Sequence, residues 1–92
     1  AADFPEQAFI LGLLKLLHLP GTDYDASARL LDAARQGINL APGKYAWIEA
    51  DVDLWRYLAY NRLGGESALE RAQALREAHP GIVDSLRALL AD

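Results

Sequence analysis

Apolar residues recur at helical spacing in five separate stretches of the chain, and each stretch is bounded by residues that commonly begin or end helices. No stretch shows the sustained alternation of apolar and polar residues that is typical of a half-buried strand. The pattern therefore predicts an all-α fold in a single domain spanning residues 1–92. The expected helices cover about 4–18, 24–36, 45–63, 67–78 and 82–91.

The expected ends of these helices follow from capping and turn residues. Asp3 and Glu6 have the spacing of a capping box, and Ser67 and Glu70 repeat it. Thr22 and Asp23 can cap the second helix. The expected stops are Pro20-Gly21, Gly37 as a left-handed C-cap, Pro42-Gly43, Gly64-Gly65 and Pro80-Gly81.

The third helix is expected to lie between two neighbours, because its apolar residues occupy about half of the helical circumference. Asp51 could instead cap a fresh helix start within it. The residues of this apolar arc are Trp47, Ile48, Val52, Leu54, Trp55, Leu58, Ala59 and Leu63.

The first helix carries more apolar residues than one packed face can cover. Nine of the twelve residues from 8 to 19 are aliphatic or aromatic. A helix at the end of an array has neighbours on one side only, so its other face is expected to expose large apolar side chains, a docking signal. The alternative is that another helix folds back over it. The residues expected to contribute to this face are Phe9, Ile10, Leu13, Leu14 and Leu17.

Composition narrows the classes of function. The chain has a net charge of −4 and shows no dense run of basic residues, which argues against nucleic-acid binding. It has no Cys, so disulfides and thiolate metal sites are excluded. The apolar stretch from 8 to 19 is too short to span a bilayer. The chain has no Met at all, so we expect it to be a processed or trimmed piece of a protein. The expected compartment is the cytoplasm, with the periplasm as the alternative.

Residues 60–64, together with Ala68, Ala72, Leu75 and Pro80, resemble one tetratricopeptide (TPR) repeat. In that family small residues let two helices pack closely and a proline ends the unit. The turn here is one residue short, and Arg56-Tyr57 replaces the usual Leu-Gly pair. Gly21, Tyr24, Ala28 and Pro42 give a more degenerate first repeat. The resemblance implies antiparallel helix pairs in a short right-handed solenoid.

A narrower similarity is to the small TPR-like chaperones of type III secretion systems. It rests on Leu54-Trp55, on residues 60–64 and 67–70, and on Pro80, and it covers only the last 40 or so residues. Such chaperones bind a small helical partner and an amphipathic helix of an export substrate. TPR modules of exopolysaccharide secretion machinery would look much the same.

Residues that could carry chemistry are better explained by structure. His18 and His79 each sit at an expected helix end, where a partly protonated imidazole favours the last carbonyl groups. Glu49, Asp51 and Asp53 form an acidic run that we expect to be a solvated edge, or else an anchor for a basic partner segment. We therefore expect no enzyme activity, no metal and no cofactor.

Tyr57 and Tyr60 fall outside the apolar arc of the third helix. Exposed aromatic residues on an inner helix of a solenoid are typical contacts for a bound segment. The alternative is that each ring covers the core while its hydroxyl stays in water.

These observations predict a non-enzymatic interaction domain that holds a helical or extended segment of a partner protein. The resemblance adds two specific forms, a secretion chaperone or an adaptor domain of a larger envelope or exopolysaccharide secretion assembly. A homodimer or heterodimer would cover the apolar face of the first helix.

Overall fold

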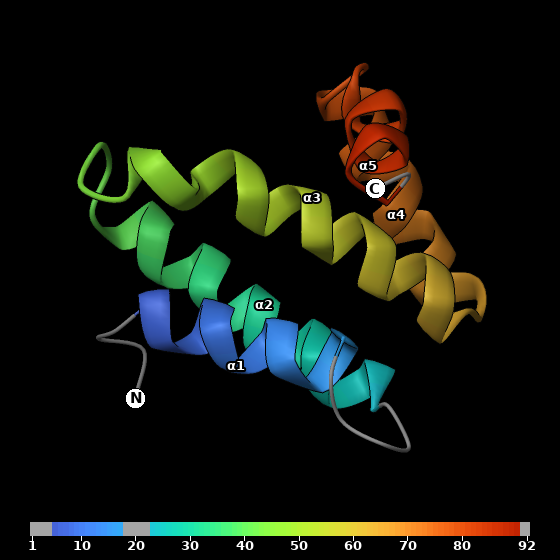
Figure 1. The fold of residues 1–92 in the computed structure, drawn as a ribbon, viewed down its shortest axis with the longest axis horizontal. Helices are drawn as coiled ribbons and strands as arrows, with labels where there is room; N and C mark the ends of the chain where they lie inside the picture. Colours follow the sequence, from blue (N-terminus) through green and yellow to red (C-terminus); the bar gives the residue numbers. More distant parts are fainter. Residues whose placement is uncertain (1–4, 18–22, 91–92) are drawn as a thin grey trace.

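The computed structural model describes residues 5–17 and 23–90, which form five helices and no strand. The helices are α1 (Pro5–Leu17), α2 (Tyr24–Leu40), α3 (Ala46–Leu63), α4 (Glu66–Ala78) and α5 (Ile82–Leu90). The all-α prediction is therefore confirmed. In Figure 1, α1, α2 and α3 lie side by side, and α4 and α5 cross the end of α3 steeply.

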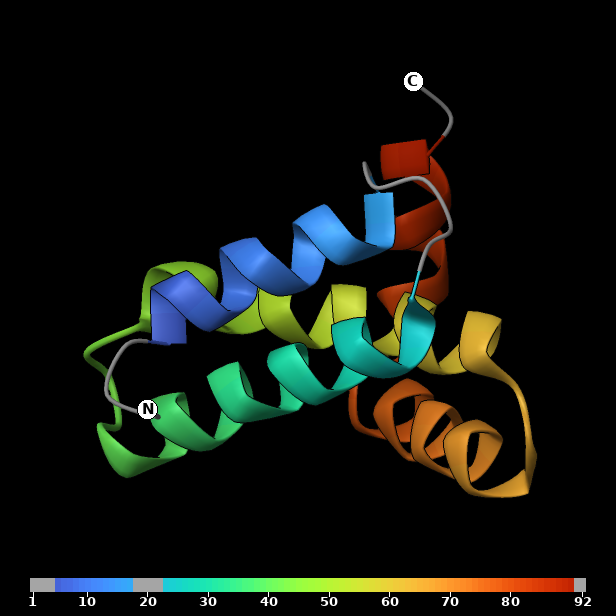
Figure 2. The ribbon, with the colours of Figure 1, turned by 90° about the horizontal axis from the view of Figure 1, so that it is seen from below.

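α3 is the central element, because it contacts each of the four other helices. α1 packs mainly on α2, and α5 contacts both α3 and α4. The view in Figure 2 shows the α1–α2 pair with the α4–α5 pair at one end of it. The described body measures 31 by 30 by 29 Å along its principal axes. The central position expected for the third helix is confirmed.

Two apolar clusters form the core. The smaller one joins the end of α2 to the start of α3 and consists of Ala34, Ile38, Tyr45, Ile48 and Val52. The larger one joins all five helices. Its buried members are Leu16, Ala28, Leu31, Leu54, Leu58, Ala59, Tyr60, Ala68, Ala72, Leu75, Ile82 and Leu86. The small residues expected along the fourth helix therefore do face the core.

α1 and α2 approach closely where two small residues meet. Gly12 is buried, and Ser27 of α2 donates a hydrogen bond from its Oγ to the Gly12 carbonyl oxygen at 2.9 Å. A Cβ added to Gly12 would lie 2.9 Å from Cγ of Leu31, which is fully buried. Gly12 thus sets the distance between the two helices.

Several helix boundaries confirm the sequence predictions. Asp23 caps α2 by accepting a hydrogen bond from the backbone N–H of Ala26 at 2.9 Å. Gly43, Gly64 and Gly65 adopt positive φ values of 84°, 73° and 86° in the expected turns. The expected cap at Asp3 and the Pro20-Gly21 stop lie outside the described residues, as does His18.

Two predicted boundaries are wrong, and the alternative helix start at Asp51 is excluded. α2 does not end at Gly37 but continues to Leu40, because the extra turn buries Ile38 in the smaller cluster. α3 runs without a fresh start at Asp51. α4 begins at Glu66 with Gly65 at the cap position, so Ser67 lies inside the helix.

Candidate functional site

The outer face of α1 carries four large apolar side chains that other parts of the described chain leave exposed. Ile10 is 56% exposed, Leu11 50%, Leu14 41% and Leu17 42%. We call these four residues the α1 face. Residues 10, 14 and 17 follow one another at helical spacing, so they form a continuous stripe along about two turns. The stripe lies opposite Gly12 and Leu16, which are buried toward the core.

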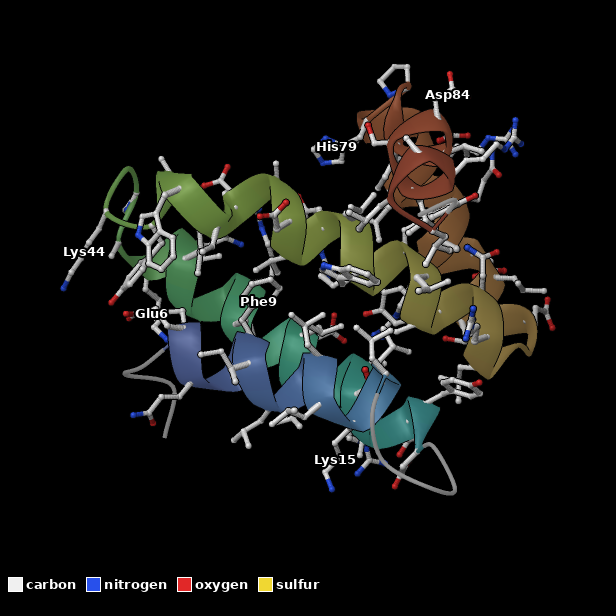
Figure 3. The ribbon with its side chains drawn as sticks, in the orientation of Figure 1. Glu6, Phe9, Lys15, Lys44, His79 and Asp84 are labelled. Atoms are coloured by element: carbon white, nitrogen blue, oxygen red, sulfur yellow. The ribbon has the colours of Figure 1, made fainter. Side chains whose placement is uncertain are left out.

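Three of the five residues predicted for this face lie on it, namely Ile10, Leu14 and Leu17. Phe9 and Leu13 are only partly exposed. Phe9 packs against both apolar clusters, and Figure 3 shows it pointing from α1 toward the neighbouring helices. Lys15, by contrast, points away from α3. Leu11 was not predicted, although its position beside Ile10 and Leu14 on the helix would have placed it there.

The N-terminal end of α1 lies beside the turn that joins α2 to α3. Ala8 and Phe9 share the smaller cluster with Ala41 and Tyr45. Figure 3 shows Glu6 of α1 and Lys44 of this turn at the same end of the molecule. Two further apolar side chains flank the turn, Leu40 at 80% and Trp47 at 68% exposure. Trp47 was expected in the buried arc of α3, and that expectation is wrong.

Tyr57 and Tyr60 differ in their exposure. Tyr57 is partly buried and packs against the larger cluster. Tyr60 is 2% exposed, and its hydroxyl donates a hydrogen bond to Asp32. The prediction that Tyr60 is an exposed aromatic residue is therefore wrong. Burial, and then the hydrogen bond to Asp32, raise the pKa of the Tyr60 hydroxyl.

The second notable feature is a network of charged side chains between α2, α3 and α4. Asp53, whose side chain is only 6% exposed, lies at its centre. Its carboxylate lies 3.1 Å from Nη1 of Arg35, 3.0 Å from Nη1 of Arg56 and 3.0 Å from Nε2 of His79. Asp53 is thus a buried anchor, and the prediction of a solvated acidic edge is wrong for this residue. Asp51 is exposed and Glu49 partly so.

Asp32 of α2 is the second acceptor in this network. It accepts a hydrogen bond from Nε of Arg56 at 3.0 Å, and Nη1 of Arg71 lies 3.5 Å away. Burial lowers the pKa of Arg56, but the hydrogen bond and the charge of Asp32 outweigh burial, so the pKa is raised overall. Across the described residues, every buried side-chain nitrogen and oxygen has a hydrogen-bond partner. The sequence analysis did not predict this network. The spacing of charged residues along α2 gives no information on which side chains of α3 and α4 lie next to them in the fold.

His79 lies at the predicted position at the end of α4, but its imidazole contacts the Asp53 carboxylate, which the sequence did not predict. In the part of the chain that the structure describes, no group of three or more His, Cys, Asp or Glu residues is placed to hold a metal ion. Among the same helices, none is long and apolar enough to cross a membrane.

Comparison of the chain with protein-family models, with curated proteins and with solved structures found no match.

Proposed function

We propose that the protein is a non-enzymatic interaction domain that binds an amphipathic helix of a partner protein on the α1 face. The observation that carries the proposal is the continuous exposed stripe of Ile10, Leu14 and Leu17 with Leu11 beside it. A contiguous apolar patch of this kind on a folded domain commonly marks an interaction site.

The α1 face alone contributes only a modest free energy of association. Four apolar side chains, each about half exposed, would gain roughly 3 to 6 kcal/mol on complete burial. Two copies pairing through this face would gain about twice that, which the cost of association, about 4 to 15 kcal/mol, offsets largely or completely. Self-association through this face alone would therefore be weak.

A partner helix can make contacts beyond α1 itself. Leu40 and Trp47, both more than half exposed, flank the α2–α3 turn beside the N-terminal end of α1, and we propose that a longer partner helix contacts them as well. A Trp at the edge of such a surface is a favourable anchor, because aromatic residues contribute heavily to binding energy. The proposed partner segment is therefore an amphipathic helix longer than the two turns of the stripe.

The TPR-like arrangement and the secretion role belong to this proposal. The α1–α2 and α3–α4 neighbours, with α5 contacting both members of the second pair, are compatible with two TPR-like pairs and a capping helix. On this view the domain is a cytoplasmic chaperone of type III secretion, with periplasm as the alternative compartment. The second candidate is an adaptor domain of an envelope or exopolysaccharide secretion assembly.

Site-specific photo-crosslinking tests the proposal. A photoreactive amino acid at position 14 should form crosslinks to one helical segment of another protein, with apolar residues at helical spacing. The same amino acid at position 69, where Leu69 is 49% exposed on α4, is the matched control and should not crosslink to that segment. Crosslinks from position 14 to the same region of a second copy would show a homodimer instead. Equal crosslinking from both positions would contradict the proposal.

A pair of variants adds a quantitative readout. The double substitution Leu14→Gln and Leu17→Gln should weaken binding of the crosslinked segment at least about tenfold, since it removes apolar contacts worth more than about 1.4 kcal/mol. The control pair Leu69→Gln and Leu89→Gln alters side chains of similar exposure elsewhere and should leave binding unchanged. Circular dichroism of both pairs establishes that the helices are retained.

A further inference from the structure

A pocket of about 340 Å³ opens between α2, α3 and α4, away from the α1 face. Its lining residues are Asp32, Arg35, Gln36, Asn39, Arg56 and Arg71. Three guanidinium groups and one carboxylate line this space, and the adjacent Asp53 carboxylate accepts from Arg35 and Arg56, so the local excess is one positive charge. A local positive excess in a chain of net charge −4 favours the binding of an anion.

The contacts within the network leave many donors unused. A guanidinium has five N–H donors in a fixed planar arrangement. Arg56 uses its Nε for Asp32 and its Nη1 for Asp53, and Arg35 uses its Nη1 for Asp53. Nη1 of Arg71 makes a long contact with Asp32, at 3.5 Å, and the Arg71 guanidinium lies over the Tyr60 ring, 5.9 Å from the ring centroid. Each arginine thus keeps donors on its remaining nitrogen atoms.

Two of the three arginines are held by the buried Asp53, and the third is mostly exposed. The side chains of Arg35 and Arg56 are 25% and 19% exposed and share the buried Asp53 as an acceptor. The Arg71 side chain is 61% exposed. Fixed donors lower the entropic cost of binding, and the exposed Arg71 side chain adds donors at the mouth of the pocket. Asp32 and Asp53 already balance two guanidinium groups, while Glu49 lies only 3.8 Å from Arg35 outside the pocket lining.

From this geometry we propose that the pocket binds an oxyanion, held by Arg35 and Arg56 and covered by Arg71. Arginine pairs with carboxylate and phosphate oxygens through two parallel N–H···O bonds, so both groups fit the donors present. The side-chain amides of Gln36 and Asn39 add neutral donors at the rim. The oxyanion is either a free inorganic anion or an acidic side chain of a bound peptide, and the test separates these two sources.

Binding can be measured by titrating the protein with inorganic phosphate and, separately, with a short oligoglutamate peptide, at constant ionic strength. The readout is the change in NMR signals of the arginine Nε–H groups and the backbone amides of α2 and α3. We expect saturable shifts at Arg56. Arg71→Gln should weaken the binding at least tenfold, because Arg71 is exposed and its loss leaves the Arg35–Asp53–Arg56 contacts intact.

Arg76→Gln is the matched control, since Arg76 lies exposed on the same helix and outside the pocket lining. Binding of phosphate with little binding of the peptide assigns the site to a free anion, and the reverse result assigns it to a peptide carboxylate. Equal weakening by Arg71→Gln and Arg76→Gln would show nonspecific charge attraction and overturn the proposal. Absence of saturable shifts with both probes would overturn it as well.

Discussion

Asp53 binds three basic side chains from three helical segments, namely Arg35 of α2, Arg56 of α3 and His79 at the end of α4. Replacing Asp53 with Asn removes the negative charge and leaves donors of Arg35 and Arg56 without their shared acceptor. We expect a loss of about 1 to 3 kcal/mol in the free energy of unfolding. Urea denaturation measures it.

Asp51→Asn provides the control for that substitution. Asp51 lies two residues before Asp53 on the same helix but is exposed, and surface substitutions of this kind usually change stability by less than about 0.5 kcal/mol. If the two variants unfold at the same urea concentration, Asp53 does not anchor the network.

Tyr60 gives a prediction about pH. Its pKa is raised in the folded state, first by burial and then by its hydrogen bond to Asp32. A group with a raised folded pKa contributes stability that is complete below the unfolded pKa, about 10, and is lost as the pH rises through the folded value. The folded protein should therefore lose stability as the pH rises above about 10.

The absorbance change of tyrosine ionisation measures this effect. The wild type should show one tyrosine that ionises late or only with unfolding, and Tyr60→Phe should remove that component. The substitution should also cost about 0.5 to 1.5 kcal/mol at neutral pH through the lost hydrogen bond. A late component that persists in Tyr60→Phe would show that another tyrosine is responsible.

At the scale of helices, Gly12 fixes how closely α1 approaches α2. An added Cβ would lie 2.9 Å from Cγ of the buried Leu31, so Gly12→Ala should destabilise the protein by about 1 to 3 kcal/mol through overpacking. This result would be opposite in sign to intrinsic helix propensity, which favours Ala over Gly by about 1 kcal/mol. Thermal or urea unfolding decides between the two effects.

Gly81→Ala is the matched substitution for Gly12→Ala. Among the described residues, nothing lies within 4 Å of a Cβ added at Gly81. The Gly81→Ala substitution should be neutral or slightly stabilising, because Ala restricts the unfolded chain more than Gly does. A stabilising effect of Gly12→Ala would contradict the close approach of α1 and α2.

The helices themselves were largely predictable, and the errors have physical causes. Apolar periodicity placed all five, and Pro-Gly or Gly-Gly turns placed several of the breaks between them. Gly37 was misread because a glycine followed by an apolar residue also occurs within helices that need close packing or extra burial. Ile38 is 1% exposed, so burial of its side chain in the extra turn of α2 stabilises the protein more than the predicted cap at Gly37 would.

At the scale of the whole molecule, the exposed side of α1 was predictable from the excess of apolar residues in one terminal helix. The division of that helix into buried and exposed faces was less certain. Phe9 is partly buried because it packs against the cluster that includes Ile48 and Val52 at the start of α3. The sequence of α1 alone does not show where α3 lies. The charge network could not be predicted, because it depends on contacts 18 to 39 residues apart in sequence.

The central claim is that the α1 face is open in the free domain and is covered by a partner helix. Since the chain has no Cys, single-cysteine variants allow the rate of thiol labelling to be measured at one site at a time. Leu14→Cys should react rapidly in the free domain, and Leu16→Cys, at a position 3% exposed, should react slowly. Adding the crosslinked partner segment should slow Leu14→Cys and leave Leu69→Cys unchanged. If Leu14→Cys reacts as slowly as Leu16→Cys in the free domain, or is not slowed by the partner, the account is wrong.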